Sequence, residues 1–153
     1  MVNETFISDD INFLLVDDYS SIRTIVKDQL RYFGFKGEIL EADSAEEGIK
    51  ILEERNGQVK GENAIDVIFS DWNMPGMNGL EFLQWARARP YLALTPFLIL
   101  TTESERIKIV DAITNGASNY LIKPWTKKEL SEKLARSWRK AYPDSSINPI
   151  VMD

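Results

Sequence analysis

The chain has 153 residues, a length typical of a single domain, and a net charge of −6 at pH 7. This acidic balance argues against a role on nucleic acid or on a membrane surface, because both need clustered Lys and Arg side chains. The chain has no Cys and no His, which excludes disulfides, zinc–thiolate sites, thiol nucleophiles and imidazole chemistry. Any chemistry must therefore use carboxylates, hydroxyls and amines.

The beginning of the chain, MVNETFISDD, carries acids and lacks the apolar core of a signal peptide. No apolar run approaches the ~18 residues that a membrane span needs. We therefore expect a cytoplasmic protein, without membrane insertion and without a nucleic-acid partner.

Five short apolar runs alternate along the chain with segments of helical periodicity. The runs cover residues 13–16, 39–40, 65–69, 97–100 and 120–122. The helical period is clearest at Ile22, Ile25, Val26 and Leu30, and again at Leu130, Leu134 and Trp138. Strands that alternate with helices predict a parallel sheet covered on both faces, and the first three runs are apolar enough for strands buried on both sides.

Four helix starts are marked by capping-box spacings. These are Ser44 with Glu47, Asn78 with Glu81, Thr102 with Glu105, and Thr126 with Glu129. Residues 11–141 form the predicted domain. Residues 1–10 and 142–153 are expected to be flexible tails, and the polar stretch 55–63 is expected to be a loop.

Polar side chains follow four of the predicted strands. Asp17 and Asp18 follow the first strand, Asp71 the third, Thr101 the fourth and Lys123 the fifth. The carboxyl ends of parallel strands share one edge of a sheet, and open α/β sheets bind ligands there. We therefore expect three acids, a hydroxyl and an amine to meet at this edge.

Each of these residues also has an ordinary structural explanation. The Asp pair and Asp71 could be turn or N-cap residues, Thr101 could begin a helix, and Lys123 could be a solvated loop residue. Complementary groups at four separate strand ends are poorly explained by four unrelated turns. The combination therefore favours a site.

The chemistry open to such a site is narrow. Clustered carboxylates repel one another unless a cation lies among them, and oxygen ligands without His or Cys favour Mg²⁺. Mg²⁺ completes its coordination shell with water and phosphate oxygens. Lys123 would place a positive charge beside a phosphoryl oxygen, and Thr101 would donate a hydrogen bond to one. Asp71 is then the candidate nucleophile, because a carboxylate can form an aspartyl phosphate.

The same residues resemble the receiver domains of two-component response regulators, and within that family most closely the stand-alone chemotaxis regulators. The matching motifs are Asp17 and Asp18, DWNMP at 71–75 with Gly79, Thr101-Thr102-Glu103, Gly116-Ala117, Tyr120 and Lys123-Pro124-Trp125. The resemblance spans about residues 11–140. It implies a three-layer (βα)5 flavodoxin-like fold with a central five-stranded parallel sheet, whose strand order is 2-1-3-4-5.

The resemblance also implies how the acidic residues act. Asp71 should accept a phosphoryl group from a phosphohistidine on a sensor histidine kinase. Asp18 and Asp71 should bind Mg²⁺ directly together with the backbone carbonyl of Asn73, and Asp17 should act through metal-bound water.

Further roles follow from the same resemblance. Lys123 should pair with the phosphoryl group, and its peptide bond to Pro124 should be cis. Thr101 should turn its hydroxyl toward the phosphoryl group, and Tyr120 should then pack inward. Trp72 and Trp125 should flank the site.

The implied output is binding, without enzymatic turnover beyond self-catalysed phosphorylation and slow autodephosphorylation. The short segment after the last helix predicts no separate output domain. The expected effector is a protein such as a flagellar motor switch component, which would read a surface around Ile109, Tyr120 and Lys127; a phosphatase is a further candidate partner.

Two alternatives remain open. The protein could be a phosphate sink that drains a kinase without binding an effector. It could also be a Mg²⁺-dependent phosphohydrolase, although such enzymes want a second acid two positions after the nucleophile, where this chain has Asn73.

Overall fold

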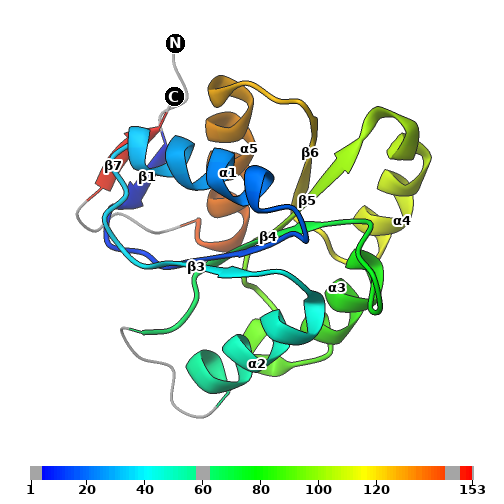
Figure 1. The fold of residues 1–153 in the computed structure, drawn as a ribbon. Helices are drawn as coiled ribbons and strands as arrows, with labels where there is room; N and C mark the ends of the chain where they lie inside the picture. The colour runs from blue at the N-terminus through cyan, green and yellow to red at the C-terminus, as the bar shows by residue number, and fades with distance from the viewer. Residues whose placement is uncertain (1–4, 58–62, 144–148, 153) are drawn as a thin grey trace.

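The structure is a computed structural model that describes residues 5–57, 63–143 and 149–152. Five parallel strands form one sheet in the order β3-β2-β4-β5-β6 (Figure 1). They are β2 (Phe13–Val16), β3 (Ile39–Ala42), β4 (Val67–Asp71), β5 (Phe97–Thr102) and β6 (Asn119–Lys123). When these five strands are counted alone, the order is 2-1-3-4-5, so the predicted flavodoxin-like fold is confirmed.

Helices cover both faces of this sheet. They are α1 (Ser20–Tyr32), α2 (Ala45–Asn56), α3 (Gly79–Arg87), α4 (Ile109–Thr114) and α5 (Lys127–Ala141), with 3-10 helices η1 (Pro90–Leu92) and η2 (Glu103–Lys108). Apolar residues of α1 and α5, such as Val26 and Leu134, pack on one face. Leu52 of α2 and Phe82 of α3 pack on the other, which gives the three layers seen in Figure 1. No helix among the described residues is long and apolar enough to cross a membrane.

The strands differ in how deeply they are buried. Every residue of β2 and of β4 is buried, including Ser70 and Asp71 at the polar end of β4. The burial predicted from the apolar runs is confirmed for these two strands. The prediction is wrong for β3, where Glu41 is exposed and Ile39 and Leu40 are only partly buried. The reason is position, because β3 is an edge strand of the sheet.

Three of the four predicted helix starts are confirmed. Asn78 and Glu81 form a complete capping box, and the side chains of Ser44 and Thr126 each accept a hydrogen bond from the backbone three residues on. The start predicted at Thr102 is wrong, and so is a helix beginning at Thr101. Strand β5 continues through Thr102, the 3-10 helix η2 follows, and α4 begins only at Ile109.

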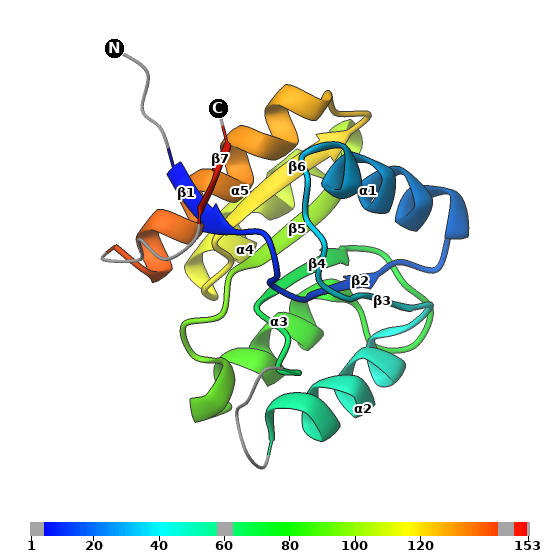
Figure 2. The ribbon, with the colours of Figure 1, turned by 90° about the vertical axis from the view of Figure 1, so that its left-hand side faces the viewer.

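The ends of the described chain also differ from the prediction of flexible tails. Strand β1 (Thr5–Ser8) pairs antiparallel with β7 (Pro149–Met152) in a separate two-stranded sheet beside α5 (Figure 2). Ile7 is fully buried in the core cluster that α5 helps to form. A pairing of residues more than 140 positions apart leaves no local signal in the sequence.

The polar stretch predicted as a loop begins inside α2. Arg55 forms an ion pair with Glu38, with Nη1 and Oε1 2.9 Å apart. Asn56 is buried, and its amide exchanges two hydrogen bonds with the backbone of Ile65. These contacts tie the end of α2 to the approach to β4, and residues 58–62 of the predicted loop lie outside the described residues.

Candidate functional site

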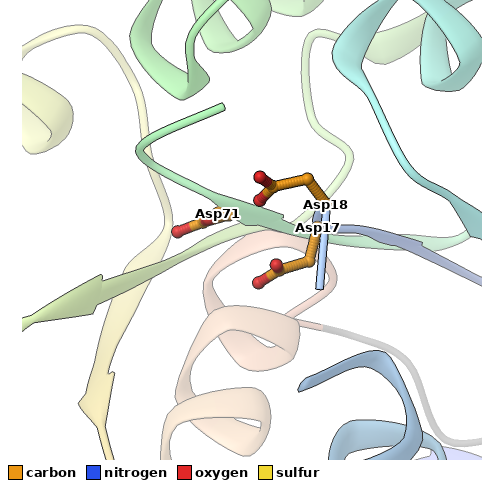
Figure 3. Close-up of side chains that lie close together, drawn as sticks. All are labelled: Asp17, Asp18 and Asp71. Atoms are coloured by element: carbon orange, nitrogen blue, oxygen red, sulfur yellow. The ribbon is translucent and has the colours of Figure 1, made fainter. Parts of the chain in front are cut away.

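The three predicted acids meet at the carboxyl edge of the sheet. Asp17 and Asp18 directly follow β2, and Asp71 is the last residue of the neighbouring strand β4. One carboxylate oxygen from each lies within 4.8 Å of the others (Figure 3). The predicted convergence of these strand ends is therefore confirmed.

Lys123 brings a positive charge into the same cluster from the end of β6. Its Nζ lies 3.0 Å from Asp71 Oδ1 and 3.3 Å from Asp17 Oδ2. Its side chain is 16% exposed, and those of the two acids are 5% exposed or less. One buried ammonium thus serves two buried carboxylates, with Asp18 beside them.

This shortage of positive charge affects how the groups ionise. Burial raises the pKa of Asp71 to about 6, the charge of Asp17 adds to the increase, and Lys123 offsets only part of it. Burial also raises the pKa of Asp17, and this increase exceeds the decrease caused by the hydrogen bond from the N–H of Tyr19 and by the charge of Lys123. Burial alone would lower the pKa of Lys123, but Asp71 and Asp17 outweigh it and raise that pKa. The cluster is therefore arranged to accept more positive charge.

The cluster opens into a pocket of about 430 Å³. Its lining includes Asp18, Asp71, Asn73, Thr102 and Lys123. Because the pocket is open to solvent, its carboxylates and Lys123 are accessible to an ion and to a phosphoryl group together.

The loop after Asp71 folds back against the strand that carries it. The N–H of Gly79 donates to the carbonyl of Trp72 at 2.8 Å, and a Cβ at position 79 would lie 2.3 Å from the carbonyl oxygen of Asp71. Only glycine fits this approach. Gly76 has a φ of +76°, in the region that favours glycine. The two glycines of the DWNMPGMNG stretch thus let the loop form one wall of the pocket.

Arg23 of α1 supports the acid pair, and the sequence analysis missed it. Its Nη1 donates to the backbone carbonyl of Asp17 at 2.5 Å, and its Nε lies 3.0 Å from Glu41 Oε1 on β3. The N–H of Tyr19 donates to Asp17 Oδ1 at 2.9 Å. Nothing local in the sequence marks Arg23, because its partners come from two different strand ends.

Thr101 lies at the predicted edge, in β5, and is 1% exposed. The described residue of this strand that lines the pocket is its neighbour Thr102. Thr101 therefore lies behind the pocket wall in this structure.

The surroundings of Lys123 include two further predicted features. The peptide bond between Lys123 and Pro124 is cis, as predicted. Trp125 is largely buried, and its Nε1 donates to Gln29 Oε1 of α1 at 2.7 Å. Trp72, directly after Asp71, is also buried.

The predicted partner face is only partly assembled. Tyr120 is partly buried, and the ammonium of Lys133 lies 3.8 Å from its ring centre. Lys127 instead lies over the ring of Tyr32 on α1, at 3.9 Å. The lysine beside Tyr120 is thus Lys133, which the sequence analysis did not single out.

The apolar part of that face also differs from the prediction. Ile109 is partly buried, whereas Ile107 is 84% and Val110 70% exposed. Ile109 is the first residue of α4, and the more exposed apolar side chains of Ile107 and Val110 lie on either side of it in the sequence.

The donor set fits a hard divalent cation. Three carboxylates offer oxygen ligands, and the chain has no His or Cys to favour a softer metal. The fold and this site together define the class of protein. It is a flavodoxin-like α/β protein with an acidic ligand site, which contains one lysine, at the carboxyl edge of the sheet.

Comparison with known proteins gives the family. The family model for the response regulator receiver domain matches residues 13–135, and the chain therefore belongs to that family. The chain is 36% identical over 137 residues to chemotaxis protein CheY-3 of Vibrio cholerae, an alignment that covers 90% of this chain and 98% of that protein.

Solved structures agree with this assignment. The chemotaxis response regulator CheY4 of Vibrio cholerae has a TM-score of 0.71 and 33% identity, covering 84% of this chain and 98% of that chain. The receiver domain of a Pseudomonas aeruginosa sensor histidine kinase shares the fold, with a TM-score of 0.69, 22% identity and coverage of 83% and 96%. That structure has a magnesium ion coordinated in its active site cleft.

Proposed function

We propose that this protein is a phosphorylation-switched response regulator that accepts a phosphoryl group on Asp71 and signals by binding another protein. The observation that carries the proposal is the pairing of Lys123 with two buried acids, Asp71 and Asp17, at the open edge of the sheet. The proposal includes a sensor histidine kinase as donor and a cytoplasmic location. It also includes a role in chemotaxis, which the names of the two Vibrio cholerae relatives support.

In the proposed reaction, an oxygen of Asp71 forms a bond to phosphorus while the phosphorus–nitrogen bond of a phosphohistidine breaks. The electron pair of that bond leaves with the imidazole, and the product is an aspartyl phosphate. Lys123, which already touches Asp71, would pair with the transferred oxygens.

A bound Mg²⁺ would supply charge to offset the phosphoryl oxygens. Asp18, Asp71 and the backbone carbonyl of Asn73 would hold it directly, and Asp17 would act through water. Asp17 also holds Lys123 in place, because Asp17 Oδ2 lies 3.3 Å from Lys123 Nζ.

The proposed switch uses the residues behind the pocket. Thr101 would move its hydroxyl toward the phosphoryl group, and Tyr120 would move inward. An effector, such as a component of a flagellar motor switch, would then read the surface around Ile109, Tyr120 and Lys127, which the exposed side chains of Ile107 and Val110 would extend. A phosphatase is a further proposed partner.

Phosphoryl uptake tests the first step. The wild type should gain the mass of one phosphoryl group when it is incubated with a phosphodonor and Mg²⁺, and the Asp71→Asn variant should gain none, because an amide does not attack phosphorus. A matched control is Asp43→Asn, which changes an exposed acid outside the cluster. A stable adduct on the Asp71→Asn protein would show that another residue is the acceptor.

A further inference from the structure

A second pocket lies at the opposite edge of the sheet from Asp71. It is bounded by the C-terminal ends of α3 and α5 and by the segments that lead into β5 and β6. Because the strands are parallel, their beginnings share the edge that faces away from the phosphoryl site. This pocket measures about 280 Å³, and its charged lining residues are Arg87 and Lys140.

Arg87 is held by neutral oxygens. Its Nε donates to the carbonyl of Gly116 at 2.9 Å, and its Nη1 donates to the carbonyls of Leu92 and Thr95 at 2.7 Å each. Its Nη2 has one long contact, 3.4 Å, to Ser118 Oγ. A guanidinium has five N–H groups, so one of them has no acceptor among the described residues, and no described carboxylate pairs with the charge.

Two further donors face the same pocket. Ser118 Oγ accepts from Arg87 and from the N–H of Phe97, so its own hydrogen is left for a ligand. Lys140 is exposed and forms no ion pair within the described ranges. No Asp or Glu is among the residues that line the pocket. Two positive charges thus lie together on a protein whose net charge is −6.

The rest of the wall is apolar. Leu94 is 70% and Ile113 46% exposed, which leaves two large apolar side chains uncovered beside the cationic groups. Apolar side chains grouped at the rim of a polar pocket are typical of a surface that contacts another protein.

We propose that this pocket binds an acidic segment of a partner protein. A Glu or Asp carboxylate would lie between Arg87 and Lys140, and an adjacent apolar side chain would cover Leu94 and Ile113. The proposal is independent of phosphoryl transfer, because the pocket shares no lining residue with the site of Asp71.

Size and charge favour this ligand over other anions. Pockets for small-molecule ligands usually measure about 300–1,000 Å³, so about 280 Å³ suits one or two side chains better than a nucleotide. A free phosphate would leave Leu94 and Ile113 uncovered. The C-termini of α3 and α5 carry partial negative charge toward the pocket, which disfavours a dianion more than a single carboxylate.

Amide NMR spectra of the ¹⁵N-labelled full chain test the proposal, with the capped peptide acetyl-Leu-Glu-Leu-amide as the probe. The amides of Leu94, Gly116 and Ser118 should shift in a concentration-dependent way. The matched peptide with Gln in place of Glu should bind about tenfold more weakly, because it lacks the charge. Equal binding of the two peptides, or the absence of any shift at these amides, would overturn the proposal.

A matched pair of lysine variants tests the residues. The Lys140→Gln variant should bind the Glu peptide about tenfold more weakly than the wild type. The Lys128→Gln variant, which changes an exposed lysine at the other end of α5, should bind this peptide as tightly as the wild type does. A change at Arg87 would disturb the fold as well, because its hydrogen bonds hold the two segments 92–95 and 116–118. Sodium acetate should shift these amides much less than the peptide does, and an equal effect at equal concentration would contradict the role of the apolar wall.

Discussion

The pockets at the two edges of the central sheet carry opposite arrangements of charge. At the carboxyl edge, Asp17 and Asp71 share the ammonium of Lys123, and Asp18 lies beside them. At the amino edge, Arg87 and Lys140 line a pocket that has no acidic lining residue. The residues that line each pocket therefore have an excess of one sign. This difference suits the proposed cation and phosphoryl site at one edge and the proposed carboxylate site at the other.

The edges differ also in what the loss of a charged side chain does to stability. The charge of Asp71 is costly in the folded state, since its pKa is raised to about 6. Burial disfavours the charge of Arg87 as well and lowers its pKa, but the Arg87 side chain donates hydrogen bonds to three backbone carbonyls. Removing the charge of Asp71 should therefore stabilise the fold, whereas removing the side chain of Arg87 should destabilise it.

The largest effect is expected at Lys123. The Lys123→Met variant should take up phosphoryl at least about 100-fold more slowly, because a preorganised charge next to the accepting oxygen is lost. Intact mass measured over time gives the rate. The control is Lys128→Met, an exposed lysine of α5. A normal rate for Lys123→Met would mean that the carboxyl edge works without its ammonium.

At the amino edge, Arg87→Met should lower the free energy of unfolding by about 2–4 kcal/mol. Three backbone carbonyls, those of Leu92, Thr95 and Gly116, would lose a charged donor. Each such bond typically contributes about 1.5–3 kcal/mol, partly offset by the apolar replacement. Urea unfolding measures the loss. Arg139→Met, at an exposed position of α5, serves as the control. A loss under about 1 kcal/mol would place Arg87 among ordinary surface residues.

Metal binding should depend on Asp18. The Asp18→Ala variant should bind Mg²⁺ at least about tenfold more weakly, since few ligands are available to replace it. The change in tryptophan fluorescence on adding Mg²⁺ reports binding, because Trp72 is buried directly after Asp71. Asp43→Ala is the control. Phosphoryl uptake that runs normally in excess chelator would contradict a metal role altogether.

The smallest effect concerns pH. The folded pKa of Asp71 is about 6 and its ordinary value 3.8, so ionisation of the folded protein costs stability as the pH rises through 6. Asp71→Asn should therefore be more stable than the wild type by about 1–3 kcal/mol above that pH. The gain should disappear below about 3.8, where the carboxyl is protonated in both states. A gain that does not change with pH would show a cause other than ionisation.

Local patterns predicted the carboxyl edge well and the amino edge not at all. Apolar runs located the strand ends that carry Asp17, Asp71 and Lys123, and the rule for parallel sheets brought them together. Arg87 gives no such signal, because its acceptors lie 5 to 31 residues away, in the two segments 92–95 and 116–118.

The errors have the same physical origin. Thr102 and Glu105 match a helix start in spacing, but β5 extends over Thr102 to pair with β6, and this tertiary pairing outweighs local capping. The pairing of β1 with β7 depends on the two ends of the chain meeting in space. Lys133 was missed because the contact with Tyr120 joins a helix to a strand across the protein surface.

The central claim is that a phosphoryl group on Asp71 changes a distant surface. The most direct measurement compares amide NMR spectra with and without beryllofluoride, a phosphoryl mimic, in the presence of Mg²⁺. In the wild type, the amides of Tyr120 and Val110 should shift together with those of the pocket, and in Thr101→Ala only the pocket should respond. If the shifts in the wild type were confined to the pocket, the claim that this protein is a messenger would be contradicted. The protein would then be a phosphate sink.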